Sequence, residues 1–264
     1  GLTRAGERGT EKDGRLRTWA VRLACVAFWL VVWELGARAI DARIILVGPL
    51  EVLARLGNLS ATGEFWASIA LSLGRVGIGY VSAVVLGVAL AALASRFSLV
   101  RELLAPLMGA LKATPVASFV ILVLLWVSSR HLSVVIALIM ALPIVYTNVL
   151  EGIRQTDADL LEMCNVFDVR GWDRVRLVYA AEVLPYFRVA VTLALGLSWK
   201  AGIAAEVIGL PDFTIGEHLY DAKVYLDTPD LFAWTLAVIV VSVVLEALVT
   251  RVMGWAMSRW EARP

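Results

Sequence analysis

Long apolar stretches separated by short polar segments dominate this 264-residue chain. Hydropathy, read with charged residues, Gly and Pro as boundaries, predicts about six helices near the roughly 20 residues that cross a bilayer. Their approximate ranges are 18–37, 67–95, 102–127, 132–152, 184–208 and 230–250. The second and third exceed the length a span requires, which predicts tilt, or a broken helix at Pro106 or Pro115. The pattern is typical of an all-α, polytopic membrane protein.

Composition supports the bilayer class. The chain is 60% hydrophobic and 18% charged, and its mean hydropathy is +0.79, whereas soluble domains are roughly 45 to 50% apolar and about 25% charged. The net charge is only +1, and no basic block with interleaved aromatic residues indicates nucleic-acid binding. We divide the chain into a flexible amino-terminal segment, 1–17, and a transmembrane domain, 18–264.

The first apolar stretch follows a basic head, so it reads either as a cleaved secretory signal or as an uncleaved anchor. We favour the anchor, because the stretch is long and lacks a clear small-residue cleavage site. Most lysines and arginines outside the spans fall in segments on the side of the amino terminus. The positive-inside rule therefore predicts that both termini, and the polar insert at 154–181, are cytoplasmic.

The second predicted span carries Gly79, Ala83, Gly87 and Ala91 at strict four-residue spacing. Such a ridge of small side chains allows another helix to approach closely, although ordinary helix packing also accounts for each residue singly. We expect this span to lie in the interior of the bundle.

The insert between the fourth and fifth spans is longer than a connection requires. Apolar residues at Leu160, Met163, Cys164 and Phe167 follow helical spacing, and a second apolar stripe begins at Trp172 after a turn. Two short amphipathic helices result. They suit either the lipid interface, where arginines and Trp172 meet anionic headgroups, or contact with a soluble protein.

The order of residues in this insert, EMCNVFDVRGWDRVRLVYAAEVLP, resembles the coupling motif of ATP-binding-cassette importer permeases. That motif is a Glu-Ala-Ala box, a spaced Gly and an Ile-x-Leu-Pro element. In this chain the matching positions are Glu162 for the Glu, Met163 and Cys164 for the alanines, Asp168 for the Gly and Val178 for the Ile. Ala180 and Ala181 stand where the motif has Leu-Pro, so the match departs from the pattern at its exit.

The resemblance extends from about residue 45 to 255 and is to permeases of the nitrate, sulfonate and taurine importer group. LKATPVASFVILVLLW, ALPIVYTNVLEGIRQTD and ALGLSWKAGIAAEVIG are similar to that group. The resemblance implies a type I ABC importer permease fold in the bacterial inner membrane, forming a homodimer. It also implies two cytoplasmic ATPase subunits, which bind ATP and Mg, and an extracytoplasmic solute-binding protein.

The coupling motif implies a set of residues that contact the ATPase. They are Glu162, Met163, Cys164, Asp168, Val169, Arg170, Gly171, Trp172 and Val178. Helix capping and surface packing remain the alternative explanation for Glu162. The chain itself is not expected to be an enzyme or to need a cofactor, because none of its lysines stands in the Gly-Lys-Ser or Gly-Lys-Thr context of a phosphate-binding loop.

Charges inside spans are costly, so Lys200 and Glu206 call for a partner or a wet cavity. We expect both to line the translocation path, together with Thr114 and Asn148; Lys200 would attract an anionic solute and Glu206 would form part of a gate. Alternatively, Glu206 lies near the outer interface and Lys200 pairs with an acid on another helix. Arg75 and Lys112 are predicted to be interfacial residues or interhelical ties.

Two histidines, His131 and His218, are isolated and are predicted to lie at the surface, with no metal site. The loop 209–229 is expected to fold partly as a helix against the membrane, either docking the binding protein or serving as a connector. The function predicted is import of a small anionic or polar solute. The alternatives are an ion-gradient-driven secondary transporter and a membrane-embedded enzyme, and no cluster of His, Asp or Glu favours the enzyme.

Overall fold

The computed structural model describes residues 3–40, 42–156, 162–164, 166–167 and 180–261. Every regular secondary-structure element in this part of the chain is a helix, which confirms the all-α prediction. In chain order these are α1 (Thr3–Ile40), α2 (Pro49–Ser60), α3 (Gly63–Arg96), α4 (Ser98–Ala113), α5 (Val116–Val123), α6 (Ser129–Arg154), α9 (Ala180–Gly209), α10 (Ile215–Val224) and α11 (Thr228–Glu261).

Membrane-crossing helices agree with the predicted spans. Among the described residues, five helices are long and apolar enough to cross a bilayer: Thr18–Ile40 of α1, Gly63–Arg96, Ser129–Arg154, Glu182–Gly209 of α9 and Thr228–Arg259 of α11. The pair α4 and α5 passes the same test but is bent by 107°, so it is a broken span or a re-entrant loop. The total of about six is therefore confirmed.

The bend between α4 and α5 falls at one of the two predicted prolines. Pro115 is the N-cap of α5, and the residue before it, Thr114, has φ −83° and ψ 129°. A proline forces the preceding residue out of the helical region, which ends α4. Pro106 lies inside α4 without ending it.

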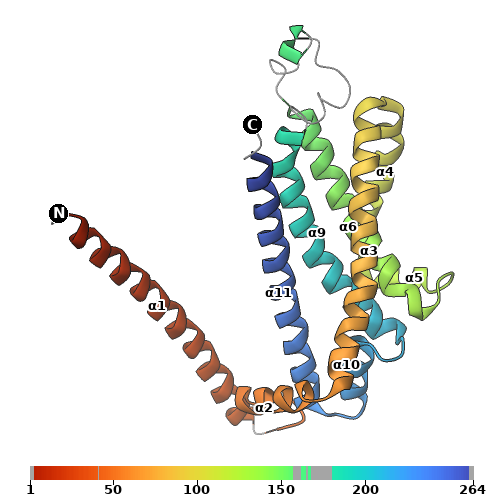
Figure 1. Cartoon of the computed structure of the whole chain (residues 1–264). Helices are drawn as coiled ribbons and strands as arrows, with labels where there is room; N and C mark the ends of the chain where they lie inside the picture. Colours follow the sequence, from red (N-terminus) through yellow and green to blue (C-terminus); the bar gives the residue numbers. More distant parts are fainter. Residues whose placement is uncertain (1–2, 41, 157–161, 165, 168–179, 262–264) are drawn as a thin grey trace.

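The helices run between two ends of a bundle (Figure 1). At one end, here called the α10 end, lie α2 and α10. At the other, the α6–α9 end, lie the carboxyl end of α6, the start of α9 and the carboxyl end of α11. The amino-terminal helix α1 splays away from the bundle, and none of its most apolar window is buried. Its carboxyl end is tied down where Trp33 Nε1 donates to the Val47 carbonyl oxygen at 2.9 Å.

The amino-terminal segment 3–17 forms the first part of α1. The flexibility expected for 1–17 stays a prediction.

The predicted ridge of small residues lies at the centre of the bundle. Gly79, Ala83, Gly87 and Ala91 are all buried, and α3 packs closely along α6. A Cβ atom at Gly87 would lie 2.8 Å from Cβ of Val145 on α6, closer than carbon atoms approach without strain. The interior position predicted for this span is confirmed, because glycine permits the approach of the two helices.

Two short helices close the α10 end. Helix α2, which the hydropathy pattern did not predict, begins at Pro49 and buries Val52. Arg55 of α2 donates from Nε to Asp230 Oδ1 of α11 at 2.7 Å, and this hydrogen bond raises the pKa of Arg55 above its ordinary value. Helix α10 is capped by the Thr214 hydroxyl, which accepts from the amide of Glu217. The expectation that 209–229 folds partly as a helix is confirmed.

Candidate functional site: the coupling segment and the α10-end polar network

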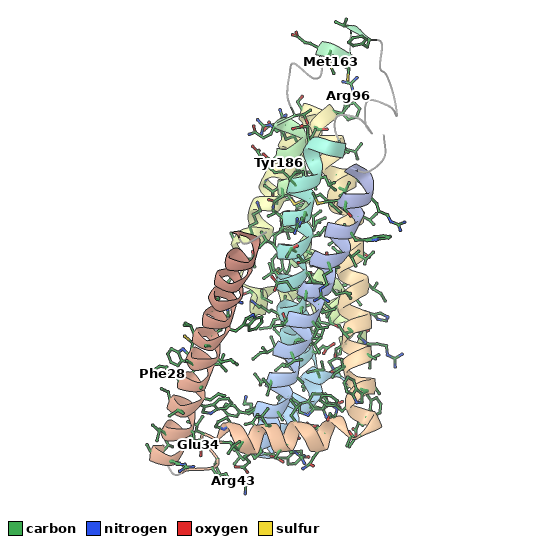
Figure 2. The ribbon with its side chains drawn as sticks, turned by 60° about the vertical axis from the view of Figure 1, so that its left-hand side comes forward. Phe28, Glu34, Arg43, Arg96, Met163 and Tyr186 are labelled. Atoms are coloured by element: carbon green, nitrogen blue, oxygen red, sulfur yellow. The ribbon has the colours of Figure 1, made fainter. Side chains whose placement is uncertain are left out.

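Of the predicted coupling segment, residues 162–164 and 166–167 are described, and Met163 lies beyond the ends of the long helices at the α6–α9 end (Figure 2). The described residues form a helical turn in which the amide of Phe167 donates to the Met163 carbonyl oxygen at 3.0 Å. Met163 is 50% exposed and Phe167 73% exposed, whereas Cys164 is buried. Glu162 is exposed. Two apolar side chains of the predicted stripe are therefore open to contact.

The other predicted coupling residues lie outside the described residues. They are Asp168, Val169, Arg170, Gly171, Trp172 and Val178. Their contact with an ATPase stays a prediction.

Close packing of α6 against α9 lies next to this segment. A Cβ atom at Gly152 of α6 would lie 2.9 Å from Cβ of Tyr186 on α9, and Tyr186 is seen near the α6–α9 end (Figure 2). Farther along, Ser198 Oγ of α9 donates to the Ala137 carbonyl oxygen of α6 at 3.2 Å. The two helices that flank the coupling segment thus contact each other along much of their length.

The four predicted path residues are not brought together by any described hydrogen bond. Lys200 is exposed and has no ion pair among the described residues. Thr114 Oγ1 donates to the Ala110 carbonyl oxygen at 2.8 Å, and Asn148 Nδ2 donates to that of Ile144 at 2.9 Å. Thr114 and Asn148 are therefore satisfied within their own helices.

Glu206 differs from the other three because it is completely buried. Its Oε2 accepts from Ser72 Oγ at 2.7 Å and from the amide of Gly216 at 3.4 Å. Its Oε1 is buried without a hydrogen-bond partner among the described residues. The guanidinium of Arg75 interacts with the carboxylate electrostatically. A buried carboxyl group held in this way connects the three helices α3, α9 and α10.

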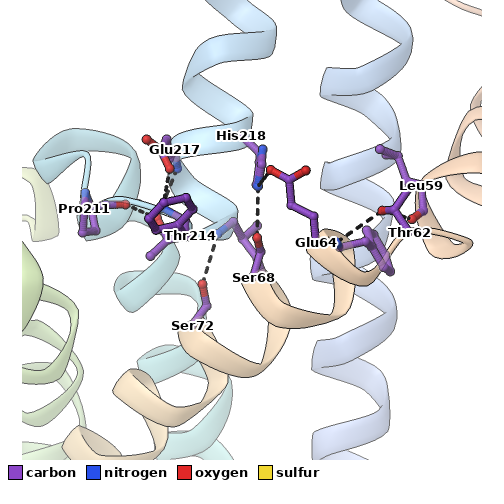
Figure 3. A network of polar contacts seen from close by, with 12 residues as sticks. Leu59, Thr62, Glu64, Ser68, Ser72, Pro211, Thr214, Glu217 and His218 are labelled. Carbon is purple, nitrogen blue, oxygen red and sulfur yellow. Dashed lines mark hydrogen bonds and ion pairs between the residues drawn. The ribbon is translucent and has the colours of Figure 1, made fainter.

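Ser72 is the residue that the sequence reading missed. Its hydroxyl donates to Glu206 and accepts from the amide of Ile215 at 3.1 Å, a bond seen from close by in Figure 3. One hydroxyl of α3 therefore holds both α9 and the first residue of α10. Its only sequence signal is a single serine in an apolar span, which ordinary intrahelical bonding also explains.

His218 corrects the expectation of two surface histidines. Its side chain is only 21% exposed, and its ring stacks on Trp234 of α11, with centroids 4.5 Å apart and planes 3° apart. Its Nε2 lies 3.0 Å from Ser68 Oγ and 4.0 Å from a Glu64 carboxylate oxygen (Figure 3). The tertiary contact with Trp234, which no local pattern reveals, buries the ring. His131 is exposed, as predicted.

Lys112 and Arg75 were both expected at an interface or as ties. Lys112 Nζ of α4 donates to Thr147 Oγ1 of α6 at 2.7 Å, so Lys112 is an interhelical tie. Arg75 forms no such bond in the described part of the chain, and its Nη1 is buried without a partner.

The chemistry of the two sites is structural and mechanical. Among the described residues, no three His, Cys, Asp or Glu side chains are grouped to hold a metal ion. The polar groups at the α10 end bind one helix to another, and the apolar groups at the α6–α9 end face outward.

The comparisons with known proteins agree with this geometry. Residues 83–261 match the family described as binding-protein-dependent transport system inner membrane component. The putative aliphatic sulfonates transport permease protein SsuC of Bacillus subtilis (strain 168) is 26% identical over 254 residues, covering 95% of this chain and 91% of the relative. SsuC of Escherichia coli (strain K12) is 30% identical, with coverages of 89% and 85%.

A further relative is the bicarbonate transport system permease protein CmpB of Synechococcus elongatus, which is 26% identical over 98% of both chains. The family match covers well over half of the chain, and the relatives match it nearly end to end. The chain therefore belongs to the binding-protein-dependent transport system inner membrane components, and it is an ABC importer permease of the nitrate and sulfonate group.

Proposed function

We propose that this permease imports a small anionic or polar solute, which a solute-binding protein delivers and ATP hydrolysis on separate ATPase subunits drives. The names of the relatives support the solute class. They refer to aliphatic sulfonates, bicarbonate and nitrate, and all of these are small oxyanions. ATP and Mg would bind to the partner ATPase, and this chain would supply the path.

The observation that carries the proposal is the exposure of the described apolar residues between α6 and α9. Met163, Val166 and Phe167 are 50%, 80% and 73% exposed there. Apolar side chains held in water beyond the bundle are costly unless a partner covers them. We propose that the partner is the ATPase, contacted by the coupling residues Glu162, Met163, Cys164, Asp168, Val169, Arg170, Gly171, Trp172 and Val178.

A movement of this segment would be transmitted along two helices. Because α6 and α9 pack together through Gly152, Tyr186 and Ser198, a displacement at one end shifts them as a unit. At its other end, α9 carries Glu206, which is bonded to Ser72 and to α10. Closure of the ATPases would thus loosen or tighten the polar network at the α10 end, switching access between the two sides of the membrane.

Orientation follows from the basic residues. Arg96, Arg154 and Arg259 stand in the last turns of α3, α6 and α11, which reach the α6–α9 end. Together with the basic residues that the sequence places in the amino-terminal segment and in the insert, they favour a cytoplasmic position for that end and for both termini. The α10 end would then face the binding protein.

A second copy of the permease is the remaining proposed partner. Helix α1 is splayed away and exposes apolar side chains around its whole circumference, including Leu23, Val26 and Trp29. A helix hydrophobic on all sides suits either lipid or the bundle of another subunit. We propose a homodimer with the ATPases at its α6–α9 end.

Reconstitution tests the proposed function. The permease, its ATPase and its binding protein are placed in liposomes, and uptake of labelled nitrate and methanesulfonate is measured with and without internal ATP. Uptake that needs ATP and binding protein is expected. Glu162→Ala and Gly171→Trp should keep the fold but separate ATP hydrolysis from uptake. ATP-independent uptake, or unchanged uptake by both variants, would overturn the proposal.

A further inference from the structure

A polar pocket opens beside the α10-end network. It has a volume of about 430 Å³ and lies between α3, the first turn of α6 and the turn from α9 to α10. Its lining residues are Leu71, Arg75, Ser129, Arg130, Leu210, Pro211, Asp212 and Phe213. Volume and polarity fit a small polar molecule better than a lipid chain.

The formal charge of the pocket is positive. Two basic residues, Arg75 and Arg130, and one acidic residue, Asp212, line it. No ion pair or hydrogen bond engages either arginine within the described residues. Glu206 interacts with Arg75 electrostatically but does not line the pocket. The side chains that line the pocket therefore carry one more positive than negative formal charge.

Arg75 provides the strongest indication of a ligand. Its Nη1 is buried and has no hydrogen-bond partner among the described residues. Buried donors in native proteins are almost always satisfied, and charged donors cost the most when they are not. Arg75 also lines the pocket, so an oxyanion that enters it would lie against a charged side chain whose hydrogen-bonding capacity is not filled.

The first turn of α6 adds to the positive potential. This 26-residue helix begins at Ser129, and the Ser128 side chain makes no capping hydrogen bond with its first amides. Free amides at a helix start favour a negative group, through hydrogen bonding and the helix dipole. The helix start and the two arginines thus act on the same space.

The third wall is a strained turn. Leu210 and Phe213 have φ of 50° and 61°, in a region that non-glycine residues rarely adopt. The turn is fixed by Thr214 Oγ1, which donates to the Pro211 carbonyl oxygen at 2.8 Å, and by the Glu217 carboxylate, which accepts from the Phe213 amide. Strain that the surroundings maintain is concentrated at functional sites.

We propose that this pocket binds a small monovalent oxyanion, which Arg75 and Arg130 contact, and that the transported solute occupies the pocket on entering the permease. The assignment rests on the proposed function. It also gives Arg75 the role that the sequence reading gave to Lys200, which is exposed on another helix.

Direct binding tests the proposal. The full-length permease in complex with its ATPase is placed in nanodiscs, and binding of methanesulfonate and nitrate is measured by calorimetry at constant ionic strength. Dimethyl sulfone, an uncharged analogue of methanesulfonate, is the ligand control. Arg130→Gln and Arg75→Gln should weaken binding of the anions by about 10-fold or more, as loss of a charge-assisted hydrogen bond implies. Asp212→Asn, which removes the competing carboxylate, should strengthen it.

The control variant is Lys223→Gln, which removes an exposed positive charge of α10 outside the pocket. It should bind the anions as the wild type does. Arg130 is exposed, so its variant should fold even if that of Arg75 does not. Equal binding by wild type and Arg130→Gln, or equal binding of methanesulfonate and dimethyl sulfone, would overturn the proposal.

Three further outcomes distinguish this proposal from a protein-docking site and from the proposed function. If Arg130→Gln weakens docking of the binding protein and leaves anion binding unchanged, the pocket receives a protein carboxylate and the proposal is wrong. If the wild type takes up solute with ATP but its pocket variants bind anions normally, only the pocket assignment fails. If uptake never depends on ATP while the variants still lose anion binding, only the proposed function fails.

Discussion

Replacing Ser72 by alanine removes one hydroxyl that serves two buried partners. The Glu206 carboxylate loses a donor at 2.7 Å, and the amide of Ile215 loses its acceptor at 3.1 Å. The Ile215 amide left without an acceptor costs about 1 to 3 kcal/mol, and the carboxylate, which keeps the amide of Gly216, loses a bond worth about 1.5 to 3 kcal/mol. We therefore expect Ser72→Ala to lower the free energy of unfolding by at least about 2 kcal/mol, because both groups remain buried.

Thermal unfolding in nanodiscs, followed by tryptophan fluorescence, measures this loss. For a chain of this size, 1 kcal/mol shifts the melting temperature by about 2 to 4 °C, so a decrease of about 4 °C or more is expected. Ser95→Ala is the matched control, since Ser95 is an exposed serine of the same helix whose hydroxyl donates only to the Ala92 carbonyl oxygen. Equal melting temperatures of the two variants would refute the bridging role of Ser72.

Two other experiments test how the helices are held together. Gly87→Val should destabilise the protein by about 1 to 3 kcal/mol through overpacking against α6. The control Gly74→Val, whose Cβ would meet nothing within 4 Å, should be neutral. Similar melting temperatures of the two variants would contradict the close approach of α3 and α6. A double-mutant cycle with Arg55→Gln and Asp230→Asn should give a coupling free energy of at most about 1 kcal/mol, because the Arg55 side chain is 40% exposed and solvent screens the pair. A much larger coupling free energy would contradict this screening.

Helices that cross the membrane could be predicted because their signal is local and strong. The predicted range 132–152 lies within Ser129–Arg154, and the range 67–95 within Gly63–Arg96. The break at Pro115 was predicted as one of two positions, since proline imposes it whatever the tertiary context. The first four residues of α3 were missed, although Thr62 caps that helix by accepting from the amide of Phe65.

The polar network could be predicted only in part. Glu206 was singled out because an acid in a span is costly. Its hydrogen-bond partners, Ser72 and Gly216, lie 134 and 10 positions away in the sequence. The contacts of Ser72 and the stacking of His218 on Trp234 depend on how the four helices α3, α9, α10 and α11 pack together, which no periodicity in the sequence encodes. Helix α2 was missed because its 12 residues are too short and too polar to register as a span.

Covalent crosslinking at the coupling segment tests the central claim most directly. Met163→Cys is made in a chain with Cys25→Ser and Cys164→Ala, which removes the two native cysteines, and the variant is assembled with the ATPase in membranes. A short thiol crosslinker is expected to join position 163 to the ATPase, and a membrane-impermeant maleimide should not reach it from outside intact cells. Labelling of position 163 from outside, with no crosslink to the ATPase, would show that this segment is not the ATPase contact.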